Sequence, residues 1–362
     1  MTEILKLKRK FARIIQMRYL LIFILVAFFG PIRGLSQSPI IYNLVLEGGG
    51  MKGVAYPGAL IGLEKLGMLD SLERIAGTSS GSLNAALLAV GYSPEELLYI
   101  SYNTNYKKFN QKGFPIIRPA MRMKNTYGWY SSERYAKSIE DAIALKTGNG
   151  GLTFGQLHDS AMHHSKFKDL YVTGTCLNEQ RTIIFSHETY PNMRIVDAVR
   201  ISSTLPFHFE TIFMKPSGVL ISHKKQTDST LLMADGGLMM NYPIHVFDTL
   251  IDYGKCEEYR PNPHTLGLRL EEPDELFTAQ GKQGPLPISI QGFNTYMQAF
   301  YEMSFEKLNR ISMSESDWQR TIIIDSKHIE TKVRKLSNEE KDMLVESGRS
   351  AVLSHYQSAR SE

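Results

Sequence analysis

The hydrophobic and polar positions along the chain predict alternating strands and helices. Ile40–Leu46 is an apolar run typical of a buried strand, and Val54–Leu66 has apolar residues at helical spacing. Leu72–Ala76 then predicts a second strand, and Ser82–Ala89 predicts a second helix. This order predicts a mostly parallel sheet with helices on its faces, which is a three-layer α/β/α fold.

The same patterns continue through the rest of the chain. The predicted strands are 169–175, 181–185, 231–234, 265–270 and 320–325, and helices are predicted to start at Ser93 and to span 131–145, 194–202, 290–311 and 338–356. Residues 102–129 mix aromatic residues with Lys and Arg, which is typical of a solvated loop. The alternative is that this loop meets anionic lipid headgroups beside a pocket. A lid, if the protein has one, is expected within 102–130 or 217–229.

The first 36 residues differ from the rest. A basic stretch precedes the 11-residue apolar run Tyr19–Phe29, which ends at Gly30-Pro31. The run is short for a bilayer span but suits the core of a signal peptide, with small residues before a cleavage point ahead of Gln37. The sequence therefore predicts export, to a periplasmic, secreted or membrane-associated location. An uncleaved membrane anchor and a buried N-terminal helix are the alternatives.

Residues 37–362 are predicted to form one domain, because they contain no repeat, low-complexity tract or convincing linker. Residues 1–36 carry seven Lys or Arg and one Glu, a net charge of +6, whereas the whole chain is +4, which leaves −2 for the domain. The domain thus lacks the basic character of a nucleic-acid-binding protein. Cys176 and Cys256 are expected to be separate buried thiols, with one disulfide in an oxidising compartment as the alternative, and no Cys/His spacing suggests a metal.

Gly77-Thr78-Ser79-Ser80-Gly81 is a G-x-S-x-G box between the second predicted strand and the second predicted helix. A serine between two glycines at such a turn exposes its hydroxyl, and the helix offers N–H groups to developing negative charge. Ser79 is therefore the candidate nucleophile. Gly48-Gly49-Gly50 offers backbone N–H groups that no Cβ shields, as an oxyanion hole requires. A tight turn against a helix is the alternative for this loop.

Asp235 is the candidate base that takes the proton of Ser79. It ends an apolar strand and precedes Gly236-Gly237, so its carboxylate should reach the same edge of the sheet as Ser79. A carboxyl with the ordinary pKa of about 3.9 is a weak base at neutral pH. Burial would raise that pKa, and hydrogen bonds to the carboxylate would lower it. The alternative is that Asp235 only organises the glycine bend as an Asx turn.

Three boxes in this order resemble the patatin-like phospholipase family, whose pattern is G-G-G-x-[RK]-G, G-x-S-x-G and D-G-[GA]. In this chain they are Leu46–Gly53, Gly77–Gly81 and Asp235–Gly237. Two further stretches are similar to the family, namely 197–206 and 241–243. The resemblance spans residues 41–250, and the C-terminal extension 251–362 matches only vaguely.

The resemblance implies a lipid acyl hydrolase that uses a Ser–Asp dyad, Ser79 and Asp235, without a catalytic histidine, metal or cofactor. It implies that the Gly49 and Gly50 N–H groups hold the oxyanion, while Gly48 and Gly53 shape the loop. Lys52 stands where many relatives have arginine, so it keeps the charge but loses the planar fork. The residues implied to support the motifs are Lys52, Gly77, Gly81, Gly236 and Gly237.

The implied substrate is a fatty-acyl ester of a phospholipid or lysophospholipid at a membrane surface, and neutral glycerides are the alternative. Several apolar residues around the boxes would line an acyl pocket, where flexible methionines suit varied chains. They are Met51, Val54, Tyr56, Leu205, Phe207, Phe209, Leu238, Met239, Met240 and Tyr242.

Three other functions remain open on sequence alone. A Ser–Asp–His esterase would add one of three histidines, His208, His245 or His264. A dinucleotide-binding module would use Gly48-x-Gly50-x-x-Gly53 with Asp70, although Asp70 precedes the second strand instead of ending it. A non-catalytic lipid-binding protein of the same fold is the third, and the intact Ser79 and Asp235 disfavour it.

Overall fold

The computed structural model describes residues 39–109, 117–252, 257–271, 289–292, 296, 299–300, 313–329 and 334–358. The predicted leader, Cys256 and most of the predicted helix 290–311 lie outside these residues. Pro39–Glu362 is one structural unit. A helix with the length and apolar character of a membrane span is not found in the described part of the chain.

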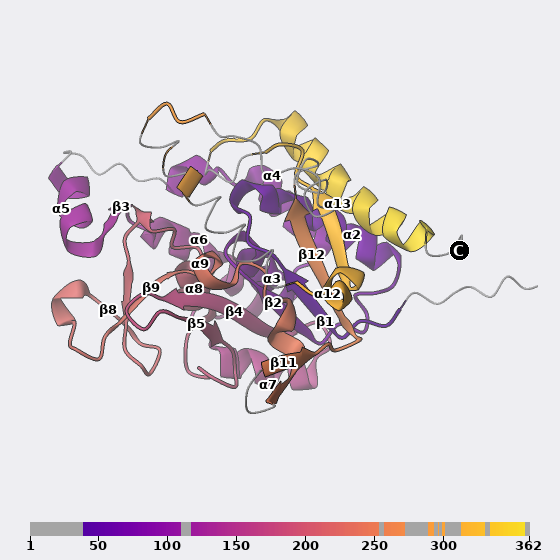
Figure 1. Cartoon of the computed structure of the whole chain (residues 1–362), viewed down its shortest axis with the longest axis horizontal. Coiled ribbons are helices and arrows are strands. Elements are labelled where there is room, and N and C mark those ends of the chain that lie inside the picture. Colours follow the sequence, from indigo (N-terminus) through magenta and orange to yellow (C-terminus); the bar gives the residue numbers. More distant parts are fainter. Residues whose placement is uncertain are drawn as a thin grey trace, which may run out of the picture. The chain divides into compact units, whose positions relative to one another are not determined.

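A nine-stranded sheet forms the centre of this unit (Figure 1). Its strands are β1 Asn43–Leu46, β2 Arg74–Gly77, β4 Asp169–Cys176, β5 Arg181–Phe185, β7 Ile212–Met214, β8 Leu220–Ile221, β9 Leu231–Asp235, β12 Thr265–Glu271 and β13 Thr321–Asp325. The order is β13-β12-β1-β2-β4-β9-β7-β8, with β5 paired to β4. The five strands from β13 to β4 are parallel, whereas β9 and β5 pair antiparallel to β4. The predicted mostly parallel sheet is confirmed.

The helices and smaller elements complete the fold. The α-helices are α2 Tyr56–Lys65, α3 Ser80–Ala89, α4 Pro94–Asn103, α5 Ile117–Thr126, α6 Glu133–Thr147, α7 Phe154–His163, α8 Ile195–Ser202, α9 Gly237–Met240, α12 Glu315–Gln319 and α13 Asn338–Ser358. The 3-10 helices are η1 Gly50–Ala55, η2 Tyr106–Phe109, η3 His223–Lys225 and η4 Ile244–Phe247. Two small sheets pair β3 Gly128–Tyr130 with β6 Phe207–Phe209, and β10 Thr249–Asp252 with β11 Glu257–Arg260.

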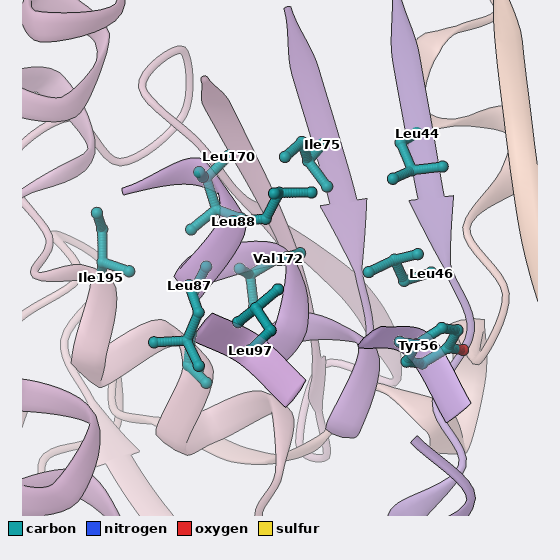
Figure 2. Close-up of a cluster of buried hydrophobic side chains, with 14 of the residues drawn as sticks. Leu44, Leu46, Tyr56, Ile75, Leu87, Leu88, Leu97, Leu170, Val172 and Ile195 are labelled. Carbon is teal, nitrogen blue, oxygen red and sulfur yellow. The ribbon is translucent and has the colours of Figure 1, made fainter. Parts of the chain in front are cut away.

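Successive residues of the central strands point to opposite faces of the sheet, as the period of two requires. Leu44, Leu46 and Ile75 belong to the large core that includes Tyr56, and Figure 2 shows Leu46 next to Tyr56. Their neighbours in the strands, Val45 and Ala76, belong to a second, smaller core. The partners of that core on the other face are Tyr242, Ile244 and Phe247. Among the described residues, the apolar core on one face of the sheet is therefore much larger than the core on the other face.

Two predictions from the pattern need correction. The predicted helix at 54–66 begins as the 3-10 helix η1, and the α-helix starts at Tyr56, with Pro57 in its first turn, where proline is favoured. Residues 102–129 are not simply a loop, because they include η2, α5 and the start of β3. Strand β3 forms only by pairing with β6, a partner far along the chain that local pattern does not reveal.

Candidate active site

Ser79 lies at the sharp turn where β2 passes into α3. Its backbone adopts φ 49° and ψ −118°, a conformation that non-glycine residues rarely occupy and that is found at strained functional turns. The Ser79 N–H donates to Ser202 Oγ at 2.8 Å, and Ser82 Oγ donates to the Ser79 carbonyl at 2.6 Å. These two bonds fix the backbone of Ser79 and do not involve its side-chain hydroxyl.

The two glycines of the box are required because the chain approaches itself closely there. A Cβ on Gly77 would lie 2.5 Å from the carbonyl oxygen of Gly81. A Cβ on Gly81 would lie 2.4 Å from the carbonyl oxygen of Leu46 and 2.5 Å from that of Glu47. Both obstacles are backbone atoms, so no side-chain rotation can relieve them. The start of α3 can therefore pack against the end of β1 only with glycine at these positions.

Gly81→Ala is expected to destabilise the protein by about 3 kcal/mol, because the added methyl group must displace backbone. The matched control is Gly151→Ala, where a Cβ would meet its nearest atom at an ordinary 3.4 Å. Chemical denaturation should show a lower midpoint for Gly81→Ala alone. Equal midpoints for the two variants would contradict this account of the elbow.

Asp235 reaches Ser79 because β4 is longer than its neighbour. Gly77, the last residue of β2, pairs with Val172, and β4 continues beyond it to Cys176. Strand β9 runs antiparallel along this projecting half, with Asp235 opposite Gly174. The ends of β2 and β9 thus meet from opposite directions. The two side chains meet as the sequence predicts, but β9 reaches this point antiparallel to β4.

The hydroxyl of Ser79 donates a hydrogen bond to Asp235 Oδ2 at 3.0 Å, and the Gly237 N–H donates to Oδ1 at 2.8 Å. The second bond is the Asx turn considered from sequence, so Asp235 both organises the glycine bend and contacts Ser79. Burial raises the pKa of Asp235 to about 7, although the hydrogen bonds from Gly237 and Ser79 lower it. Desolvation therefore outweighs hydrogen bonding here, which the sequence left undecided.

The glycine loop lies beside the same elbow. Gly48 donates its N–H to the Asn241 carbonyl at 3.0 Å, and a Cβ there would lie 2.3 Å from Asn241 Oδ1. The Gly49 N–H donates to Ser80 Oγ at 3.0 Å, and a Cβ on Gly53 would lie 2.8 Å from that oxygen. Within the described residues the Gly50 N–H has no acceptor, and Gly50 adopts φ 54°. Gly48 and Gly53 thus fit the implied shaping role.

Glu47 and Lys52 are buried next to this loop. Burial raises the pKa of Glu47 to about 7, while the charges of Arg269 and Lys52 and a hydrogen bond from the Leu270 N–H lower it. The Leu270 N–H lies 2.8 Å from Glu47 Oε2. Glu47 therefore ties the start of the glycine loop to β12.

Sequence reasoning assigned no role to three residues that hold the site together, namely Ser202, Asn241 and Ser80. Asn241 makes a second hydrogen bond with Gly48, because its Nδ2 donates to the Gly48 carbonyl at 2.9 Å. Ser202 and Asn241 do fall within the two extra stretches, 197–206 and 241–243, that are similar to the family. That similarity was the only signal for them, because their contacts are long-range.

The three candidate histidines have other partners. His245 binds Asp248 at 2.9 Å, His264 Nδ1 lies 3.0 Å from the Ile40 carbonyl, and His208 packs against the ring of Tyr130. In the described part of the chain no histidine hydrogen-bonds to the Ser79 or Asp235 side chain. The geometry therefore favours the two-residue arrangement over a triad.

Two clusters of described residues have ligand atoms close enough for a cation, and neither includes Ser79 or Asp235. They are His158–Asp169–His187 and His245–Asp248–Asp317. In the second cluster Arg320 already pairs with both carboxylates, at 2.5 and 2.7 Å.

These features define the protein as an α/β protein with a serine elbow and a buried aspartate partner. The model of the family described as "Patatin-like phospholipase" matches residues 44–248, more than half of the chain. The chain therefore belongs to the patatin-like phospholipase family.

Curated relatives extend the comparison. The chain is 31% identical over 219 residues to uncharacterized protein R571 of Acanthamoeba polyphaga mimivirus, and 30% identical over 213 residues to probable lipid hydrolase 463L of Invertebrate iridescent virus 6. It is 29% identical over 211 residues to uncharacterized protein YqhO of Bacillus subtilis. These matches cover 60%, 58% and 56% of this chain, and 65% of each relative.

Among solved structures, VipD from Legionella pneumophila is similar in fold, with a TM-score of 0.52 and 15% identity. The similarity covers 89% of this chain and 68% of VipD. ExoU in its complex with SpcU from Pseudomonas aeruginosa gives a TM-score of 0.49 at 21% identity, over 90% of this chain and 53% of that one.

Proposed function

We propose that this protein is a serine hydrolase of lipid acyl esters, with Ser79 as nucleophile and Asp235 as base. The observation that carries the proposal is the 3.0 Å hydrogen bond from Ser79 Oγ to Asp235 Oδ2. A carboxyl with a pKa of about 7 is well matched to general base catalysis near neutral pH. The family and the similarity to probable lipid hydrolase 463L of Invertebrate iridescent virus 6 support the same chemistry.

In the proposed reaction Ser79 Oγ attacks the acyl carbonyl carbon while its proton passes to Asp235. The tetrahedral intermediate then collapses, the bond from the acyl carbon to the ester oxygen breaks, and the leaving alcohol takes the proton from Asp235. Water repeats these steps on the acyl-enzyme, with Asp235 accepting the proton of the water and returning it to Ser79. No step requires a group beyond these side chains and the oxyanion donors.

The glycine loop is proposed to supply the donors for the oxyanion. The Gly50 N–H is the donor without an acceptor in the described chain. The Gly49 N–H becomes available when the Ser80 hydroxyl, which now accepts its bond, rotates away. Preorganised N–H groups of this kind lower the barrier because they meet the charge only as it develops.

The surroundings of Asp235 support a fatty-acyl substrate. Of the apolar residues around the boxes, Met51, Val54 and Tyr56 are buried in the core. Others are half-buried next to Asp235 or after Ser202, where an acyl chain can contact them. They are Leu205, Phe207, Leu238, Met239 and Met240. A phospholipid or lysophospholipid is the proposed substrate.

A fluorophosphonate probe is expected to label the folded protein at Ser79, because only an activated serine attacks the phosphorus. Peptide mapping by mass spectrometry identifies the labelled residue, and heat-denatured protein is the control that should not react. Labelling that maps to another serine, or that survives denaturation, would contradict the proposal. Hydrolysis of phosphatidylcholine, lysophosphatidylcholine, triacylglycerol and a short p-nitrophenyl ester then ranks the substrate classes.

A further inference from the structure

The adjacent elements α5, β3 and β6 carry exposed aromatic and apolar side chains, and α5 also carries basic ones. Met121 on α5 is 56% exposed, and Tyr127 and Trp129, at the end of α5 and on β3, are 47% and 38% exposed. Phe207 on β6 is 46% exposed, and β6 pairs with β3 through Gly128. Helix α5 lies beside β3 at the left of Figure 1. We call Met121, Lys124, Tyr127 and Trp129 the α5–β3 surface, and Phe207 connects it to the chain segment that follows Ser202.

Backbone strain marks the same region. Tyr127 and Phe207 both adopt φ 59°, in the left-handed region that bulky residues rarely occupy. Both rings are nevertheless exposed to solvent. Packing in the core therefore does not account for aromatic residues at these strained positions. Contact with an apolar phase outside the protein does.

The charge of this region is positive. Residues 117–132 contain three Lys or Arg and no Asp or Glu, although residues 37–362 together are slightly acidic. Lys124 is exposed on α5. The carboxylate that follows β6, Glu210, is already engaged, since it accepts a bond from Ser131 at 2.8 Å and lies 3.6 Å from Arg200. Lys124 thus adds an exposed positive charge to the aromatic side chains of this surface.

One short segment connects this surface to the candidate active site. Ser202 Oγ accepts the Ser79 N–H at 2.8 Å, and the Thr204 carbonyl accepts the Asp235 N–H at 2.8 Å. Three residues later, Phe207 pairs with Gly128 of β3. A membrane held against the α5–β3 surface would therefore lie beside the segment that positions both Ser79 and Asp235.

We propose that the α5–β3 surface docks the enzyme onto anionic phospholipid membranes and so delivers lipid to Ser79. Tryptophan and tyrosine favour the membrane–water interface, where the ring is buried and the polar group stays wet. Lysine beside them attracts anionic headgroups. This proposal deepens the proposed function, because it names the surface from which that site draws its substrate.

Trp129 can report on docking directly, because the chain has two tryptophans, Trp129 and Trp318. In full-length Ser79→Ala, Trp318→Phe protein, Trp129 is the single tryptophan and vesicles are not hydrolysed. With vesicles of phosphatidylcholine and phosphatidylglycerol, its emission is expected to shift to the blue and to be quenched by brominated lipid. Unchanged Trp129 emission would overturn the proposal, even if another part of the chain bound the vesicles, and would leave this surface to a protein partner.

Charge reversal tests the anionic preference. Lys124→Glu is expected to reduce partitioning onto the phosphatidylglycerol vesicles by at least about fivefold and to have little effect with phosphatidylcholine alone. Lys65→Glu is the matched control, since Lys65 is an exposed lysine on α2. Equal losses of partitioning in the two variants would contradict docking through the α5–β3 surface.

In protein with Ser79 intact, Lys124→Glu should hydrolyse a soluble short-chain ester as fast as wild type does. If wild-type protein fails to hydrolyse that ester, the proposed function fails while the docking result stands.

Discussion

Ser79→Ala is expected to lower kcat for ester hydrolysis by at least about 10³-fold. Removing the nucleophile of a serine hydrolase leaves only binding and the oxyanion donors to assist the attack of water. The elbow itself should survive, because the bonds that hold it use the backbone N–H and carbonyl of Ser79. The change in kcat is measured by steady-state kinetics on a lysophospholipid and a p-nitrophenyl ester. Circular dichroism verifies that the variant is folded.

Ser80→Ala is the matched control for that experiment, because it removes a neighbouring hydroxyl of the same box. Ser80 Oγ accepts one hydrogen bond from the Gly49 N–H, and a single such bond contributes about 1 kcal/mol. The expected change in kcat/KM is therefore tenfold or less. If both variants lost activity equally, or if Ser79→Ala remained active, Ser79 would not be the nucleophile.

Asp235→Asn is expected to abolish activity and yet to stabilise the folded protein at pH 8. An asparagine can keep the Gly237 bond at its oxygen and can donate to Ser79 Oγ from its nitrogen, but it cannot accept the proton of Ser79. The loss in kcat should be on the order of 10³- to 10⁴-fold. The gain in stability arises because asparagine stays neutral where aspartate must ionise in a buried position.

The pH dependence of this stabilisation follows from the pKa of Asp235, which burial raises to about 7 in the folded protein. Below pH 4 both the folded and the unfolded protein bind the proton, so the carboxyl contributes its full stability there. As pH rises toward 7 the unfolded chain releases the proton first, and the free energy of unfolding falls by at most about 1.4 kcal/mol per pH unit. Above pH 7 the loss is complete and stays constant.

Urea denaturation of wild type and Asp235→Asn at pH 5 and pH 8 measures this difference. The free energy of unfolding of Asp235→Asn should exceed that of wild type by more at pH 8 than at pH 5, and the difference between the two pH values should be on the order of 3 kcal/mol. Glu47 changes stability in the same direction, because its pKa is also raised to about 7, but it is common to both proteins and cancels in the comparison. The activity of wild type should rise through the same pH range as Asp235 becomes a carboxylate. An advantage independent of pH would show that Asp235 is not a buried acid.

The sequence by itself determined the elements and the chemical groups of the candidate site. Short-range patterns predicted β2, α3 and the turn between them, because glycine spacing and apolar periodicity are local properties. The order of the three boxes identified Ser79, Asp235 and the glycine loop, and the family match agrees with that resemblance.

The tertiary structure decided how those groups meet. The pairing of β9 along the projecting half of β4 brings Asp235 to Ser79, and that pairing joins residues 57 to 61 positions apart in the chain. The raised pKa of Asp235 depends on burial by the whole fold, and the supports from Ser202 and Asn241 are long-range hydrogen bonds. The physical reason is that desolvation and strand pairing depend on which distant segments exclude water from a group, and no local sequence pattern encodes that.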